Sequence, residues 1–173
     1  MKTLKLSMIS AAVIAAMGIS SAFADVAQSN SGSTVNVNSS TSVVKKCTTL
    51  TGGSISFTAY VPDATAANDA ATTVSVKCTK GTPVSISMDK GEGNGATEGA
   101  RLLSSDDTTD TLEYSLYQNS ARSILWGTDS DAASFNGDGL LSTTTLNVYG
   151  RIPALQDVAP GAFTDSVLVT LTY

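Results

Sequence analysis

Cys47 and Cys78 are the only cysteines in this 173-residue chain, and histidine is absent. Without histidine, neither a Ser-His-Asp nor a Cys-His nucleophilic site can form. Two thiolates could hold a metal ion only with further ligands, and histidine is a usual one. In an oxidising compartment, a single intramolecular disulfide is therefore the simplest interpretation of the pair.

The other residues that could carry chemistry lie in turn-like sequence. Four carboxylates gather near the start of one predicted strand: Asp106, Asp107, Asp110 and Glu113. No neighbouring sequence indicates the apolar pocket that would separate the pKa values of an acid and a base, so we interpret them as a solvated turn. Residues 91–95 lack the glycine spacing of a dinucleotide site. Residues 129–131 and 136–139 lack the terminal glutamate of a calcium loop. The sequence predicts no catalytic residue, no metal and no cofactor.

The first 24 residues have the organisation of an export signal. Lys2 and Lys5 precede an apolar run over residues 8–19, and Ser-Ala-Phe-Ala over residues 21–24 provides a small-residue cleavage site. The apolar run is too short for a membrane-spanning helix. We therefore expect a signal peptide over residues 1–24, a mature chain that begins at Asp25, and folding outside the cytoplasm, where cysteines oxidise.

Charge limits the partners of the mature chain. The full chain has 10 Lys and Arg against 15 Asp and Glu, and the signal peptide contains two of these cations, so the mature chain has a net charge of −7. An acidic chain repels phosphate backbones and anionic lipids, so we expect no nucleic-acid partner. No later stretch is long and apolar enough to cross a bilayer, and we expect no direct membrane insertion.

Short segments of alternating apolar and polar residues predict strands with one buried face. The clearest segments are residues 54–60, 73–78, 84–88, 112–117, 146–149 and 167–173. Residues 63–71 have some helical character but follow a proline, so we expect a loop or a single turn there. A series of short strands within one domain predicts an all-β fold, an immunoglobulin-like β-sandwich.

The N-terminal extension over residues 25–41 is rich in Ser, Asn, Thr and Val and cannot form a core alone. In an extended conformation, one side of it carries Ala27, Ser29, Ser31, Ser33, Val35 and Val37. The opposite side carries the polar residues Gln28, Asn30, Asn36 and Asn38. This alternation is typical of a strand that pairs with a sheet. A disordered secreted N-terminus is the alternative.

The last predicted strand still alternates where the chain stops. One side of it carries Val167, Val169, Leu171 and Tyr173. No further strand follows to cover the neighbouring edge. We therefore expect an incomplete sandwich that lacks its last strand and is completed by a strand from elsewhere.

A series of motifs extends from Cys47 to the C-terminus. The most specific are Tyr-Gly-Arg-Ile-Pro-Ala over residues 149–154 and Pro-Gly-Ala-Phe-Thr-Asp over residues 160–165. The others are Gly53–Tyr60 with Pro62, Val74–Cys78, Met88–Gly91 with Arg101–Leu102, Leu112–Tyr117 and Trp126–Gly127. With these motifs in this order, the chain resembles the spore coat protein U domain family, which includes the pilins of archaic, Csu-type chaperone-usher pili. Phe163 stands where family members often carry a tyrosine, a departure that leaves the architecture unchanged.

The resemblance implies a pilin that is not an enzyme and that polymerises by donor-strand complementation. Its partners would be a periplasmic chaperone, an outer-membrane usher and other copies of itself, and its destination a surface pilus for adhesion and biofilm formation. The extension 25–41 would supply the donor strand to the next copy, with Val35 and Val37 as its main anchors. The domain 42–173 would supply the acceptor edge at Val167–Tyr173.

Two alternatives remain open from the sequence. A self-contained secreted coat or adhesive protein of the same fold would complete its sheet with its own N-terminal segment. A periplasmic carbohydrate-binding module would need a planar row of exposed aromatic side chains, and aromatic residues are only 6% of the chain. We expect structural roles for two further residues, Trp126 in the core and Arg151 in an ion pair with a carboxylate.

Overall fold

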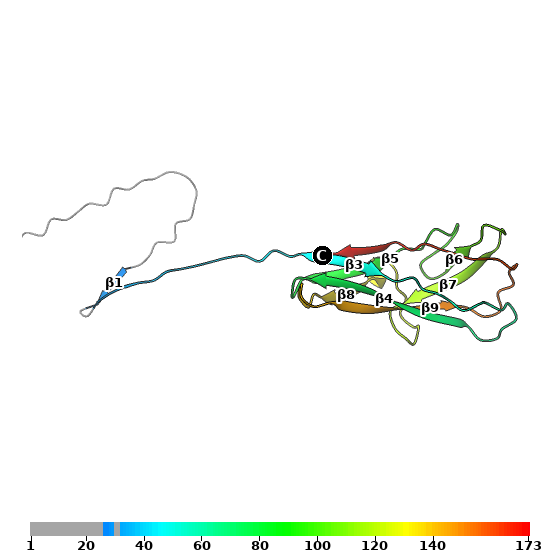
Figure 1. Cartoon of the computed structure of the whole chain (residues 1–173), viewed down its shortest axis with the longest axis horizontal. Coiled ribbons are helices and arrows are strands. Elements are labelled where there is room, and N and C mark those ends of the chain that lie inside the picture. Colours follow the sequence, from blue (N-terminus) through cyan, green and yellow to red (C-terminus); the bar gives the residue numbers. More distant parts are fainter. Residues whose placement is uncertain (1–25, 30–31) are drawn as a thin grey trace, which may run out of the picture. The chain divides into compact units, whose positions relative to one another are not determined.

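The computed structural model describes residues 26–29 and 32–173. The chain divides into two compact units, Met1–Val43 and Val44–Tyr173, close to the predicted boundary between extension and domain. The first unit contains β1 (Val26–Ser29) and β2 (Gly32–Val35), which pair antiparallel with Val26 opposite Val35 (Figure 1). The predicted signal peptide and Ser31 lie outside the described residues.

The second unit is a sandwich of two antiparallel sheets (Figure 1). The larger sheet has the order β3-β4-β9-β7-β6, with β3 (Cys47–Gly52), β4 (Asn68–Cys78), β9 (Thr144–Ile152), β7 (Thr111–Tyr117) and β6 (Arg101–Ser104). The smaller sheet has the order β10-β5-β8, with β10 (Val169–Thr172), β5 (Pro83–Met88) and β8 (Ala133–Asn136). A single 3₁₀ turn covers Asp129–Asp131. The predicted immunoglobulin-like, all-β fold is confirmed.

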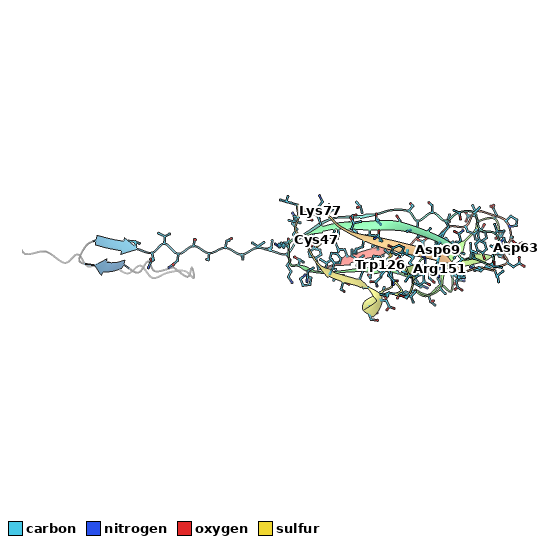
Figure 2. The ribbon with its side chains drawn as sticks, turned by 90° about the horizontal axis from the view of Figure 1, so that it is seen from below. Cys47, Asp63, Asp69, Lys77, Trp126 and Arg151 are labelled. Carbon is cyan, nitrogen blue, oxygen red and sulfur yellow. A yellow bond between two sulfur atoms is a disulfide. The ribbon has the colours of Figure 1, made fainter. Side chains whose placement is uncertain are left out.

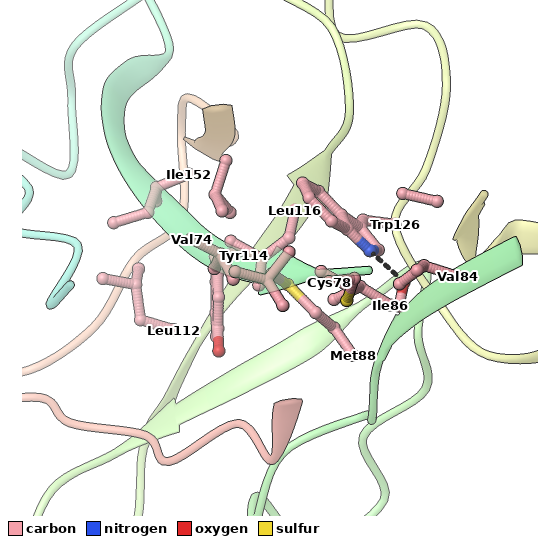
Figure 3. Close-up of a cluster of buried hydrophobic side chains, with 13 residues drawn as sticks. Val74, Cys78, Val84, Ile86, Met88, Leu112, Tyr114, Leu116, Trp126 and Ile152 are labelled. Atoms are coloured by element: carbon pink, nitrogen blue, oxygen red, sulfur yellow. Dashed lines mark hydrogen bonds between the residues drawn. The ribbon is translucent and has the colours of Figure 1, made fainter. Parts of the chain in front are cut away.

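The core lies between the two sheets and is built from the alternation that the sequence shows. Along β4, β5 and β9 every second side chain is buried or half-buried and its neighbours are more exposed, as expected for strands with one face on a core. Trp126 is 1% exposed, as predicted, and its indole N–H donates to the backbone oxygen of Ile86 at 2.9 Å (Figure 3). This bond satisfies the ring's only polar atom, so the largest core side chain is buried without an unpaired donor.

The predicted disulfide joins Cys47 to Cys78 across the first strand pair of the larger sheet. The two cysteines are directly opposite each other in the register of β3 and β4, with their Cα atoms 4.0 Å apart. The disulfide closes a loop with a sequence separation of 31. Closure of such a loop stabilises the fold by about 3 to 4 kcal/mol through the entropy of the unfolded chain.

Two segments differ from the expectation. Residues 68–71 belong to β4, so the predicted loop over residues 63–71 ends earlier than expected. Residues 54–58 keep the predicted alternation of exposed and half-buried side chains, whereas Ala59 is exposed and Tyr60 is half-buried, and residues 54–60 belong to no strand. A sequence pattern reports which side chains are buried, whereas strand assignment requires a hydrogen-bonded neighbour, and this segment has none along most of its length. Within the described residues, no helix has the length and apolarity needed to cross a membrane.

Candidate functional site

An apolar groove of about 710 Å³ opens along the sandwich between two extended segments. Residues 55–60 and Pro62 form one wall, and residues 158–165 contribute the other. The floor consists of Leu103, Leu112, Tyr114 and Ile152. Leu112, Tyr114 and Ile152 also belong to the core cluster of Figure 3, so the groove opens directly onto the hydrophobic core.

The first wall continues the chain direction of β3. Ile55 and Phe57 are half-buried and pack against the core, while Ser54, Ser56 and Thr58 face solvent. The two apolar side chains lie directly over Gly150 of β9, where an added Cβ would come within 2.7 Å of the Phe57 ring. Glycine at position 150 therefore allows this wall to lie close to the sheet.

Tyr60 fixes the far end of the first wall. Its hydroxyl donates to the backbone oxygen of Pro153 at 3.0 Å and accepts a hydrogen bond from the backbone N–H of Gln156 at 2.8 Å. The side chain of Asn68 also donates to the backbone oxygen of Thr58 at 2.8 Å. These bonds hold the end of the first wall in place, although residues 54–60 belong to no strand.

Asp165 organises the second wall. Its carboxylate accepts hydrogen bonds from the Tyr114 hydroxyl at 2.6 Å, from the Glu92 N–H at 2.8 Å and from the Ser166 N–H at 2.8 Å. Gly91 has a φ of +80° and lies against this carboxylate, so both its backbone angle and its missing side chain suit the site. Burial and the neighbouring Asp165 carboxylate raise the pKa of the Tyr114 hydroxyl, so Tyr114 keeps its proton, and its hydrogen bond to Asp165, to a higher pH than an exposed tyrosine would.

Asp89 connects the second wall to β5. Its carboxylate accepts hydrogen bonds from the Gly91 and Leu168 N–H groups, each at 2.9 Å, and its own N–H donates to the Leu168 oxygen at 3.1 Å. Ser104 and Thr164 add a pair of backbone hydrogen bonds, each 2.9 Å long, on the β6 side. The wall is therefore held by bonds to its outer neighbours.

Arg101 stabilises the turn beneath this network. It is fully buried, and its guanidinium donates to four backbone oxygens, those of Met88, Asp89, Glu98 and Trp126. Burial lowers the pKa of the guanidinium, and the nearby anionic groups oppose this effect. One buried cation thus ties β5, β6 and the Trp126 segment together behind the groove.

The edge of β10 presents unpaired backbone groups. The Leu168 oxygen points toward Asp89 at the end of β5, and backbone groups of consecutive residues in a strand point to alternate sides. The backbone N–H and C=O groups of Val167, Val169 and Leu171 therefore point away from β5. In the described residues β10 has a single partner, β5, and β3 has a single partner, β4. Each is the edge of its sheet, so each can accept one more strand.

The outer face of the larger sheet is polar. Arg151 forms a bidentate pair with Asp69, with N···O distances of 2.8 and 2.9 Å, as predicted for Arg151. Arg122 adds a contact to Asp69 at 3.2 Å, and its guanidinium lies 5.8 Å from the ring centre of Tyr149. The hydrogen bonds from Arg151, supported by the charge of Arg122, hold the pKa of Asp69 below its ordinary value. These groups satisfy one another and leave the apolar groove as the candidate site.

The predicted acceptor residues line the open edge in part. Val167, Val169 and Leu171 are half-buried and pack against the core, whereas Tyr173 is 56% exposed. Among the predicted donor residues, Ala27 and Ser29 lie in β1, Ser33 and Val35 lie in β2, and Val37 follows β2. Val35 and Val37 are 57% and 89% exposed, respectively. The roles of donor and acceptor residues remain predictions.

The sequence interpretation missed most of the groove. It assigned the acceptor edge to the last strand alone and treated residues 54–60 as an ordinary strand. The sequence interpretation assigns no acceptor role to Ile55, Phe57, Val158 or Phe163, although these residues line the groove. Two sequence features could have indicated the groove: the alternation in residues 54–60 and the proline- and glycine-containing stretch 158–165.

Three comparisons place the chain among known proteins. A family model described as Spore Coat Protein U domain matches residues 33–170. "Protein U" of Myxococcus xanthus is 33% identical over 105 residues, which are 58% of this chain and 58% of that protein. One chain of the crystal structure of the CsuC-CsuE chaperone-tip adhesion subunit pre-assembly complex, from archaic chaperone-usher Csu pili of Acinetobacter baumannii, matches with a TM-score of 0.56 and 17% identity. That match covers 76% of this chain and 40% of the other, and it supports the fold.

Proposed function

The chain belongs to the Spore Coat Protein U domain family, and we propose that it is a structural pilin subunit of a chaperone-usher pilus. In this proposal residues 1–24 are removed on export, and residues 42–173 form a non-enzymatic domain. Residues 25–41 act as a donor strand for the next copy. A periplasmic chaperone and an outer-membrane usher assist assembly, and the product is a surface filament that serves adhesion and biofilm formation.

The observation that carries the proposal is the apolar groove between residues 55–62, which follow the edge strand β3, and residues 158–165, which precede the edge strand β10. Its floor is hydrophobic core, and hydrogen bonds of Tyr60, of Asp165 and between Ser104 and Thr164 hold its walls in place. A groove of this kind accepts an extended chain that supplies backbone hydrogen bonds along its length and apolar side chains at every second residue.

The energetics favour such a joint. Each backbone hydrogen bond contributes about 1 kcal/mol net, and each buried valine contributes about 1.5 to 3 kcal/mol. Several bonds together with burial of Val35 and Val37 offset a large part of the entropy cost of ordering an exposed segment. Because the donor and the acceptor are different surfaces of one chain, the contact repeats without closing and produces a filament.

The first experiment compares the full mature chain, purified from the periplasm, with a variant that lacks residues 25–37. We expect the full chain to form filaments in electron microscopy and ladders in unheated SDS gels, and the truncated variant to form neither. We expect a synthetic peptide of residues 25–38 to raise the melting temperature of the truncated variant, because it fills the groove.

The same comparison separates the alternatives. A full chain that stays monomeric, with a truncated variant that is unstable, would indicate a self-contained coat protein whose own N-terminus completes the sheet. Equal melting temperatures of the two monomers, with no effect of the peptide, would contradict strand complementation altogether.

A further inference from the structure

Two groups of charged side chains, of opposite sign, lie at the two ends of the second unit. β4 has 11 residues and spans the unit over about 35 Å. Figure 2 shows Cys47 and Lys77 at one end of the sandwich and Asp63 at the other. The intervening outer face contains the Asp69–Arg151 pair, whose charges compensate each other.

Four cations lie at the end where β3 begins. We call this the cationic end: Lys45, Lys46, Lys77 and Lys80. Lys46 lies next to Thr79, since the Thr79 N–H donates to the Lys46 oxygen at 2.8 Å, and Lys77 lies opposite Thr48 in the ladder. Lys80 belongs to the turn between β4 and β5. One carboxylate, Asp138, is close by and accepts a hydrogen bond from Thr144.

Six carboxylates lie at the opposite end. We call this the acidic end: Asp63, Asp106, Asp107, Asp110, Glu113 and Asp157. The β6–β7 turn supplies three of them. Hydrogen bonds from backbone N–H groups to side chains join this region to the loop after β9: the Glu113 N–H donates to the Gln156 side chain at 2.8 Å, and the Ala159 N–H donates to the Asp110 carboxylate at 2.7 Å. The surrounding sequences 53–67, 102–116 and 153–167 contain no Lys or Arg.

The charges at both ends are available to a partner. In the described part of the chain, the ion pairs are those of Asp69 with Arg122 and Arg151, and no residue of either end takes part. Lys45, Lys46 and Lys80 are exposed, as are Asp63, Asp106 and Asp107. Two unpaired patches of opposite sign on one chain are complementary to each other on neighbouring copies.

Strand direction determines which ends meet. β10 runs toward the cationic end, because Thr172 pairs with Ser85 near the start of β5. All described strand pairs are antiparallel, so we take a donor strand beside β10 to be antiparallel as well. The C-terminal end of such a donor strand lies at the acidic end of the copy that receives it. Residues 38–46 then connect the strand to the cationic end of the donor copy's own domain. A parallel strand would leave at the cationic end and place like charges together.

We propose, resting on the function proposed above, that the cationic end of each copy binds the acidic end of the copy that receives its strand. The partner is thus a second copy of this chain, and the contact is separate from the groove. The nine-residue linker has a root-mean-square span of about 15 to 18 Å as a flexible chain. The Debye length is about 8 Å at physiological salt. The linker therefore allows the ends to meet without forcing contact, and their attraction sets the spacing and stiffness of the filament.

Electron microscopy of filaments at two salt concentrations tests the proposal. At about 10 mM salt the Debye length is about 30 Å, and at about 1 M it is about 3 Å. We expect wild-type filaments to be stiffer at low salt, with a shorter distance between domains, and to lengthen at high salt by at most about 30 Å per subunit, the extended length of the linker. The variant Lys45→Glu/Lys80→Glu should be long and flexible at both salt concentrations.

Two control variants complete the experiment. Adding Asp106→Lys/Asp107→Lys to the first variant restores the original net charge of the chain but leaves the two ends without opposite signs, so these filaments should stay flexible at both salt concentrations. Lys90→Glu changes an exposed lysine that follows β5 and belongs to neither charged group, and this variant should behave as wild type. All four changed end residues are exposed and lack side-chain hydrogen bonds in the described structure, so folding should be preserved.

SDS-resistant ladders distinguish a failure of this proposal from a failure of the proposed strand exchange, because they report strand exchange alone. If wild type forms no ladder, the proposed function fails, and with it this proposal. If wild type and variants form equal ladders and show the same spacing at both salt concentrations, strand exchange stands and the contact between charged ends is refuted. Stiff, salt-dependent filaments in the variant with restored net charge would show that net charge, not the contact between the ends, sets the stiffness, and would also overturn the proposal.

Discussion

At the scale of single residues, the pair formed by Tyr114 and Asp165 makes the second wall of the groove sensitive to alkaline pH. The pKa of Tyr114 is raised in the folded state, so folding is favoured fully below the pKa of an unfolded tyrosine, about 10. This stabilisation is lost as pH rises above that value, because the unfolded state can release a proton that the folded state retains.

The Tyr114→Phe variant should therefore show a weaker loss of stability between pH 9 and pH 11 than wild type, in the approximate window set by an unfolded tyrosine. Urea unfolding at a series of pH values gives the measurement. Tyr173→Phe is the matched control, since Tyr173 is 56% exposed and should leave the pH dependence unchanged. An unaltered alkaline slope in Tyr114→Phe would contradict the assigned cause.

Substitutions at Val37 and Asn36, adjacent residues on opposite faces of the predicted donor strand, test its register. In the predicted register, Val35→Asp or Val37→Asp places an unpaired charge in an apolar groove at a cost of several kcal/mol, enough to abolish ladders. Asn36→Asp faces away from the groove and should be tolerated. Secretion level and disulfide content control for folding. Normal ladders in Val37→Asp, or equal loss in all three variants, would place the donor register elsewhere.

At the scale of elements, Gly150 links β9 to the first wall of the groove. Gly150→Ala adds a Cβ that collides with Ile55 and Phe57, so we expect a loss of about 1 to 3 kcal/mol in stability and displacement of residues 54–58. Ladder formation should fall with it. Gly52→Ala in β3 is the control, since its added Cβ meets no atom within 4 Å. Denaturant unfolding measures the difference, and equal values for both variants would show that the wall tolerates the displacement.

At the scale of the whole molecule, the disulfide constrains the unfolded chain. Replacing both Cys47 and Cys78 by Ala should lower the free energy of unfolding by about 3 to 4 kcal/mol. Wild type in reducing agent should show the same loss, which separates the cross-link from the packing of Cys78, a residue only 1% exposed. If the reduced wild type is as stable as the oxidised protein, the entropy of loop closure does not contribute the expected free energy of unfolding.

The residues themselves determined the class of this protein. The two cysteines without histidine led to the disulfide, the alternation in residues 73–78, 84–88 and 112–117 gave strands β4, β5 and β7, and the motif series led to the Spore Coat Protein U domain family. Each of these inferences needs only local pattern or composition, because side chains in a strand alternate whatever the neighbouring strand is.

The tertiary structure alone decided where the groove lies and what holds it open. Residues 54–60 have the pattern of a paired strand, yet whether an edge is paired depends on chain segments distant in sequence. The sequence does not predict that Arg101 is fully buried. Its burial depends on four backbone oxygens from three separate segments, which accept hydrogen bonds from the guanidinium only in the folded structure. The separation of charge also depends on the fold: the lysines are spread over residues 45–80 and the carboxylates over residues 63–157, and only antiparallel pairing brings each group to one end.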